Sequence, residues 1–280
     1  GDMLDKTIGV SVSKRNVSGR AYNDGISIRG LGGKRVNILI DGIRVAEAYT
    51  GYGRDVVDVD LLKRVEILKG PSSALYGSDG LAGAVSYITK DPSDLAEFGQ
   101  NYFSVNTSYD EDNEQTKVGL LAARVGESLE SLIQITTREL SQVELHDDAT
   151  QELDPFDGEQ LSVLAKFKLS LSDSVGLTLT LDSQEFEGDY IFKSQAGMSY
   201  FPDVVSASNV LGVDDGNRDR GTLSLDFSNE TSMFDNGSIR FYAQETDQKQ
   251  ITTRSKTYFA AGPPMTVSYT HLRAHETIDD

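Results

Sequence analysis

Apolar and polar residues alternate along most of the chain from about residue 102 onward. In the segment 159–170 the alternating apolar positions are Leu161, Val163, Ala165, Phe167 and Leu169. The same period of two recurs over 175–188, 220–230 and 238–258. Because successive side chains of a β-strand point to opposite faces, this pattern predicts strands with one apolar and one polar face.

Seven strands are predicted in this region. Several exceed the usual ~5–6 residues of a globular strand and match the ~9–11 residues with which a tilted strand crosses a bilayer. The predicted ranges are 102–109, 117–125, 129–143, 159–170, 175–188, 220–230 and 238–258.

The predicted connections alternate in length. The segments 126–128, 171–174 and 231–237 are short, whereas 144–158 and 189–219 are long, with 110–116 on the same side as the long ones. Short turns at one end and longer loops at the other are typical of outer-membrane β-barrels, in which the long loops face outward. A soluble β-rich binding or adhesion module is the alternative of another class.

Residues 1–90 follow a different pattern, with many glycines and short apolar runs. We expect strands at 26–29, 36–40, 65–68 and 84–88, a tight turn at Asp41-Gly42, and a helical turn capped by Asp58. This combination predicts a small mixed α/β unit.

The composition of the chain excludes several classes of site and partner. The chain has no Cys, which excludes disulfides and thiolate metal sites, and it has no apolar run of the ~18 residues that a membrane helix needs. Residues 1–90 carry 13 Lys and Arg against 10 Asp and Glu, whereas the remainder carries 13 against 34. The acidic remainder argues against nucleic acid as a partner. The sequence shows no pattern typical of a catalytic site or of a metal site, so we expect that the protein is not an enzyme.

Four ordered motifs resemble the plug of TonB-dependent receptors. They are Ile26–Leu31, Val36–Gly42, Leu62–Ser78 and Gly83–Lys90. The segment Thr89–Leu95, with Leu164–Lys166 and a loop at Asp215–Arg220, is similar to the haem, haemoglobin and transferrin receptor branch.

The resemblance implies a mainly β fold: a small mixed α/β plug domain followed by the first strands, about seven, of a truncated transmembrane antiparallel β-barrel. We expect a plug at 1–95, a partial barrel at 96–265, and a tail at 266–280 that is not receptor sequence. Plugged barrels have about 22 strands, so the complete protein is expected to be longer. Because Thr7–Val12 resembles the middle of a plug, further sequence is also expected before it.

The function implied is TonB-dependent import of haem or haemoprotein-derived iron across the Gram-negative outer membrane. A ferric siderophore or another metal chelate is the alternative ligand. The expected partners are TonB with its inner-membrane energy complex, the ligand, and outer-membrane lipid; no intrinsic cofactor is expected.

Two sets of site residues follow. In the family, the arginines that match Arg29 and Arg64 pair with barrel glutamates, so with Glu66 they are expected to lock the plug to the barrel; ordinary surface charge is the alternative. Ligand contacts are expected at Tyr49, Tyr52 and Arg54 of the plug apex and at His146 of an outer loop. Packing is the alternative role of the tyrosines.

Overall fold

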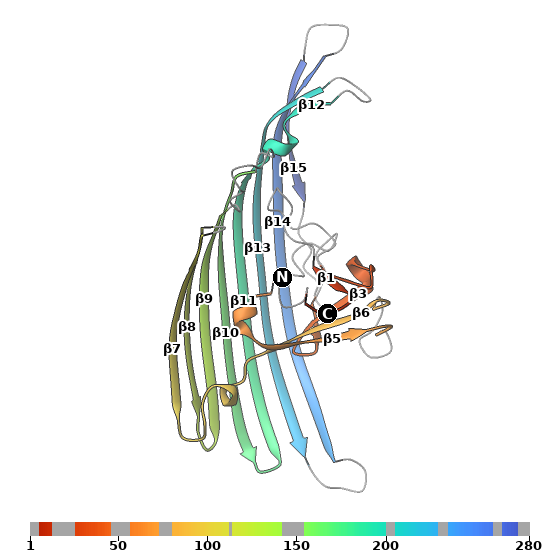
Figure 1. The fold of residues 1–280 in the computed structure, drawn as a ribbon. Helices are drawn as coiled ribbons and strands as arrows, with labels where there is room; N and C mark the ends of the chain where they lie inside the picture. Colours follow the sequence, from red (N-terminus) through yellow and green to blue (C-terminus); the bar gives the residue numbers. More distant parts are fainter. Residues whose placement is uncertain are drawn as a thin grey trace.

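The computed structural model describes residues 6–12, 26–45, 57–72, 80–111, 114–141, 154–199, 205–228, 235–259 and 265–273. Two parts are visible in Figure 1: a small N-terminal unit, and a large antiparallel sheet of long strands. Within these ranges, no helix is long and apolar enough to cross a membrane.

The N-terminal unit is built from short strands and 3₁₀ turns. A four-stranded sheet has the order β4-β3-β6-β5, in which β3 and β6 are parallel, and β1 pairs separately with β2. The elements are β1 (Val10–Val12), β2 (Ile26–Ile28), η1 (Gly33–Arg35), β3 (Val36–Ile40), β4 (Ile43–Arg44), η3 (Val59–Leu61), β5 (Leu62–Lys69), β6 (Gly83–Thr89) and η4 (Pro92–Asp94).

Apolar residues of these strands form the core of the unit. Ile28, Val36 and Val85 are fully buried at its centre. Gly83 starts β6 with φ of 151°, and a Cβ there would lie 2.1 Å from the carbonyl oxygen of Leu68. Only glycine fits such a conformation and such a close approach, which explains the glycine at the β5–β6 contact.

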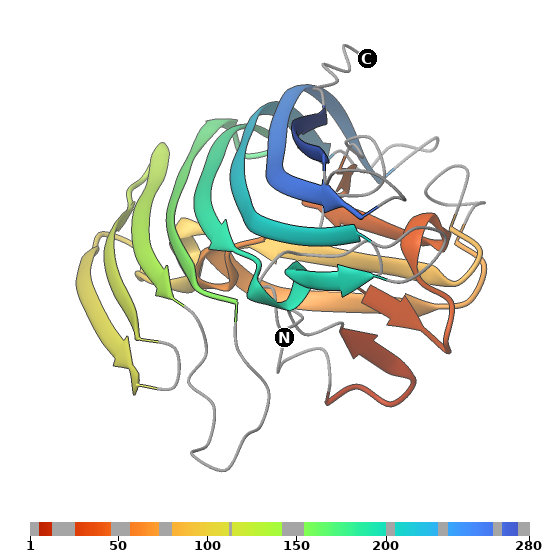
Figure 2. The same ribbon diagram turned by 90° about the horizontal axis from the view of Figure 1, so that it is seen from above.

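The large sheet contains seven long strands in an antiparallel series, with a short strand on β13 and a further strand on β14. Figure 2 shows that it curves around the N-terminal unit and does not close on itself. Its strands are β7 (Asn101–Asp110), β8 (Gln115–Val125), β9 (Leu129–Ser141), β10 (Phe156–Ser172), β11 (Val175–Ile191), β12 (Gly197–Ser199), β13 (Val205–Ser228), β14 (Asn236–Tyr258) and β15 (Met265–Arg273), with the 3₁₀ turn η6 (Lys193–Gln195) before β12.

The two faces of the sheet differ in polarity. The inner face, which contacts the N-terminal unit, carries polar residues such as Lys166, Gln184 and Arg220. The outer face carries exposed and half-buried apolar residues, and strand register places them side by side. We call the following set the apolar band: Ile133, Ile135, Ala165, Phe167, Leu169, Leu177, Leu179, Leu181, Leu223, Leu225, Ile239 and Phe241.

Acidic residues replace apolar ones on the outer face at the loop end of the same strands. We call this set the acidic belt, and it has one exposed member on each of five neighbouring strands: Glu139, Glu159, Glu185, Asp219 and Glu245. The apolar band therefore ends at a sharp boundary. An apolar outer face and a polar inner face are the pattern of a sheet that faces lipid on one side and a lumen on the other.

The predicted strands are confirmed in number and order, but one long loop was predicted wrongly. The segment 189–219 is largely strand, because β11 continues to Ile191 and β13 already begins at Val205. Asp215 and Asp219 lie on the outer face of β13, and Arg218 and Arg220 on its inner face. Both faces of β13 are polar over residues 214–220, so the alternation of apolar and polar residues that marks the other strands is missing there.

The domain boundaries at 95 and 265 stay predictions. Strand β7 begins at Asn101, soon after the predicted end of the plug. Strand β15, of which residues 266–273 belong to the tail predicted to be artefactual, pairs with β14. This pairing describes their backbone and leaves their origin a prediction.

Candidate functional site

The tight turn between β3 and β4 forms the first contact between the N-terminal unit and the sheet. Asp41 and Gly42, the two turn residues, both have positive φ, at 50° and 81°. Arg220 of β13 donates a hydrogen bond to the carbonyl oxygen of Ile40 at 2.7 Å, and Arg240 of β14 donates one to the carbonyl oxygen of Asp41, also at 2.7 Å. Arginines from two neighbouring strands therefore hold the backbone of one turn.

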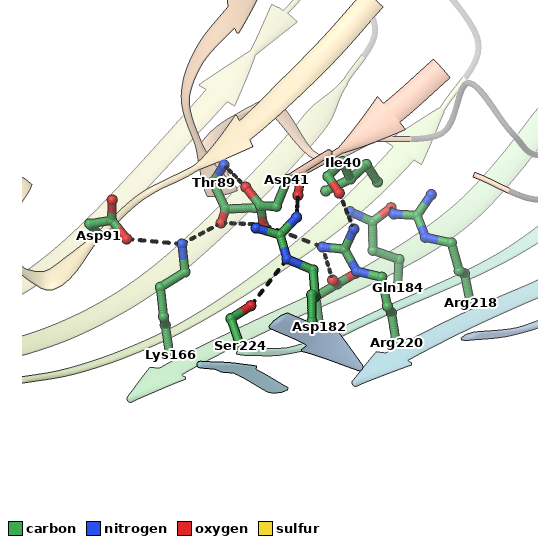
Figure 3. Close-up of polar contacts among 11 residues, drawn as sticks. Ile40, Asp41, Thr89, Asp91, Lys166, Asp182, Gln184, Arg218, Arg220 and Ser224 are labelled. Carbon is green, nitrogen blue, oxygen red and sulfur yellow. Dashed lines mark hydrogen bonds and ion pairs between the residues drawn. The ribbon is translucent and has the colours of Figure 1, made fainter. Parts of the chain in front are cut away.

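Asp41 connects this turn to the end of β6. Its carboxylate accepts hydrogen bonds from the backbone N–H of Thr89 at 2.9 Å and from the Thr89 hydroxyl at 2.8 Å. The same hydroxyl accepts a hydrogen bond from Lys166 of β10 at 2.7 Å. Figure 3 shows these groups together, with Arg220 beside Asp41. The turn, the β6 end and the sheet thus form one continuous polar network.

Arg220 also has a partner inside the sheet. Asp182 of β11 lies directly opposite Arg220 in the strand register, and their side chains form an ion pair. The side chains of Arg220 and Asp182 are 1% and 3% exposed. Because buried charges are costly unless paired, this ion pair keeps the Arg220 charge compensated from within the sheet.

A second contact surrounds η3, and we call it the η3 cluster: Asp58, Asp60, Lys117, Gln134 and Arg138. Arg138 of β9 forms ion pairs with Asp58, at 2.7 Å, and with Asp60. Lys117 of β8 pairs with Asp60 at 3.1 Å, and Gln134 donates a hydrogen bond to the carbonyl oxygen of Asp60 at 2.9 Å. Asp58 also caps η3 through the backbone N–H of Asp60.

The third contact centres on Asp91, which follows β6. Its carboxylate pairs with Lys166 at 3.1 Å and with Lys168 at 2.8 Å, both on β10. In all three contacts the N-terminal unit supplies acceptor oxygens, mostly carboxylates and carbonyls, and each contact includes cations from the sheet.

The pKa values of two carboxyls reflect these cations. Burial alone would raise the pKa of Asp60, but the hydrogen bond from Lys117 and the charge of Arg138 outweigh it, so the pKa lies below its usual value. Burial likewise would raise the pKa of Asp91, and Lys168 and Lys166 together lower it. Both groups therefore stay ionised, as ion pairing requires.

The arrangement attaches one part of the chain to the other rather than performing chemistry. Each contact joins charged groups that come from the N-terminal unit and from the wall of the sheet. Within the described ranges, no three His, Asp or Glu side chains are grouped to hold a metal ion.

The predicted lock residues lie elsewhere. Arg64 pairs with Glu66 of its own strand β5 at 2.7 Å, and both side chains are about half exposed, at 51% and 55%. Arg29 is exposed and has a positive φ of 52°. Pairing of Arg29 and Arg64 with barrel carboxylates stays a prediction. The predicted ligand contacts Tyr49, Tyr52, Arg54 and His146 lie outside the described residues.

Sequence reasoning missed the residues that do make the attachment. Asp41 and Asp58 carried only local signals, a turn and a cap, and both are present in the structure. Lys166 and Lys168 stood at the polar positions of an alternating strand, which is a signal for the inner face. No sequence pattern connected the plug carboxylates with their cationic partners, because the partners are far apart in the chain. Arg138 and Asp58, for example, are separated by 80 residues.

Comparisons with known proteins identify both parts. The family model described as TonB-dependent Receptor Plug Domain matches residues 1–84. Hemoglobin-binding protein A of Haemophilus influenzae is 27% identical over 91% of this chain and 27% of its own length. The Hemin receptor of Yersinia enterocolitica is 42% identical over 36% of this chain and 14% of its own length.

The solved structure of the FrpB iron transporter from Neisseria meningitidis has the same fold. It superposes with a TM-score of 0.71 at 14% identity, covering 98% of this chain and 46% of that one. This chain thus spans about a quarter of the length of the Haemophilus relative. The N-terminal unit therefore matches the plug domain of TonB-dependent receptors, and the chain as a whole shares the fold of the FrpB iron transporter.

Proposed function

We propose that the complete receptor imports haem, free or taken from a haemoprotein, across the outer membrane of a Gram-negative bacterium. The observation that carries the transport part is the division of the barrel strands into an apolar outer face and a polar inner face with the plug attached to it. A wall of this kind separates lipid from a lumen, and a plug held in the lumen blocks free passage.

Transport then requires the plug to rearrange. Its attachment by ion pairs and hydrogen bonds suits this role, because polar contacts exchange with water at small net cost, whereas a large apolar interface would not. TonB and its inner-membrane energy complex are the proposed source of the force, in line with the plug-domain match.

Haem as the ligand is supported by relatives named for hemoglobin binding and for hemin. Tyr49, Tyr52, Arg54 and His146 remain the proposed ligand contacts. Tyrosine rings can stack on a flat macrocycle, with aromatic contacts worth about 0.5–1.5 kcal/mol beyond area burial. A ferric chelate is the second candidate, favoured by the fold shared with a protein titled only as an iron transporter.

Growth separates the two ligands. An iron-starved host that cannot synthesise haem is given the full-length receptor and either haem or a ferric siderophore. We expect growth on haem, and reduced growth when Tyr49 and Tyr52 are both replaced by Ala. In a control, the haem that the host cannot make is supplied through another route. Growth on the ferric siderophore under that condition, together with no growth when haem is offered only through the receptor, would assign the receptor to chelates instead.

A further inference from the structure

The inner face of strands β8, β9 and β10 is cationic although the chain as a whole has a net charge of −18. Its charged residues are Lys117, Arg138, Lys166 and Lys168, with Glu130 as the one inward carboxylate that the register places on these strands in the described ranges. We call the four cations the cationic track. Acidic residues of the same strands, such as Glu139 and Glu159, lie on the outer face.

The track runs along the strands rather than around the barrel. Lys117 and Arg138 are register partners near the loop end, and Gln160 continues their row on β10. Lys166 lies six residues further along β10 toward the turn at 173–174, a distance of roughly 20 Å at ~3.3 Å per residue. The inner-face residues between the two ends include the buried polar Thr136 and Ser162 and the buried Leu164, which packs with Leu61 of the N-terminal unit.

The plug covers this track with carboxylates. Asp58 and Asp60 pair with Arg138, Asp60 pairs with Lys117, and Asp91 pairs with Lys166 and Lys168. Figure 3 shows the side chains of Lys166 and Asp91 pointing toward each other. Movement of η3 and of the segment after β6 would take the three carboxylates away and leave the four cations on the wall.

Three cations of the track, Lys117, Arg138 and Lys166, differ from Arg220 in this respect. Arg220 keeps Asp182 as its counter-ion within the wall. Arg138 lies in register between Lys117 and Gln160, and Lys166 lies between Leu132 and Thr180, so none of these neighbours is acidic, whereas Lys168 lies opposite Glu130 of β9. An uncovered track would therefore attract the next available anion, because charge-assisted hydrogen bonds to carboxylates are among the strongest polar contacts.

We propose that the cationic track is a transient binding site for carboxylates of the ligand, uncovered when the plug rearranges. The plug carboxylates occupy the site at rest, and the two propionates of haem take their place during passage. The assignment rests on the proposed function. It differs from that function in locating a site along the barrel wall, on residues that the resting plug hides.

The test compares variants that break the same ion pairs from opposite sides. The wall variant Lys117→Gln/Arg138→Gln removes the ion pairs with η3, which we call the latch, together with two of the four track cations, whereas the matched plug variant Asp58→Asn/Asp60→Asn removes the latch alone. Energised uptake of labelled haem is measured in cells that express the full-length receptor. Receptor level in the outer membrane and haem binding to de-energised cells check that both variants fold.

We expect haem uptake to fall roughly fivefold for each lost cation in the wall variant, and to rise in the plug variant, where no plug carboxylate competes for the track. Haem dimethyl ester, which lacks the carboxylates, should be taken up equally by the wall variant and the wild type. A second matched pair of variants is the wall variant Lys166→Gln/Lys168→Gln and the plug variant Asp91→Asn, for which we expect the same difference in haem uptake.

Equal changes in haem uptake in the wall and plug variants would show that the ion pairs only hold the plug in place. That result would overturn the proposal that the cationic track binds carboxylates of the ligand. An equal loss with haem dimethyl ester would also overturn it, because the effect would not depend on carboxylates. Absence of haem uptake by the wild-type receptor is a different result, since it would overturn the proposed haem function itself.

Discussion

Replacement of Arg220 by Met is expected to destabilise the receptor more than replacement of both Arg220 and Asp182. The single change removes the hydrogen bond to Ile40 and leaves Asp182 buried without its ion-pair partner. Breaking a buried pair from one side costs about 3–5 kcal/mol. The double variant Arg220→Met/Asp182→Leu removes both charges of the ion pair, so the main remaining cost is the lost contact with the plug, about 1.5–3 kcal/mol.

Urea unfolding of the full-length receptor in detergent micelles measures these free energies, provided that the slope stays constant among the variants. Lys63→Met serves as a control, because the Lys63–Asp94 ion pair is partly exposed, at 35% and 23%, and pairs of this kind contribute only ~0–1 kcal/mol. A double variant that is less stable than the Arg220 single variant would refute the reasoning. It would mean that Asp182 stabilises the wall by contacts other than the ion pair.

Three further outcomes follow from the faces of the sheet and from the carboxyl pKa values. Leu179→Arg places a charge in the apolar band and should cost about 2–4 kcal/mol in the same unfolding assay; a cost below ~1 kcal/mol would exclude a lipid-facing position. Asp60 and Asp91 have pKa values below the ordinary 3.8, so the stability they contribute is complete above that value and is lost only as the pH falls through the lowered pKa. Protection of the plug from protease should then stay constant from pH 8 to 5, and a loss already near pH 6 would contradict the assignment. Single cysteines at Ser206 and Asp173 should differ on intact cells, with an impermeant thiol reagent labelling position 206 only; labelling at 173 alone would invert the topology.

The strands that the sequence predicted well share one physical property. In β10, β11 and β14 the outer face is apolar and the inner face is mainly polar along the turn-side part of each strand, so burial against lipid imposes a visible period of two there. Residues 214–219 of β13 have no such contrast, because Asp215 and Asp219 face outward beyond the apolar band while Asp214 and Arg218 face inward. A strand that is polar on both faces cannot be distinguished from a loop by hydropathy.

The site was less predictable than the fold. Turn and cap signals at Asp41 and Asp58 reflect local backbone geometry, and sequence reasoning placed both correctly. Each of these residues has a second role toward the barrel, in which its partners are set by sheet register and by the docking of the plug. Arg220 lies 180 residues from Ile40 in the chain, and no local pattern connects residues that are so far apart.

The polarity of the attachment shows why charge summed over a segment is a poor guide in a barrel. Residues 91–280 are strongly acidic as a sum, which on its own suggests an acidic surface facing the plug. Neighbouring residues of a strand face opposite environments, however, so a sum adds charges that never meet the same partner. On β9, Arg138 points inward to the plug carboxylates while Glu139, the next residue, lies on the outer face in the acidic belt. Charge must therefore be counted separately for the two faces, and on that count the described inner wall of β8–β10 is cationic.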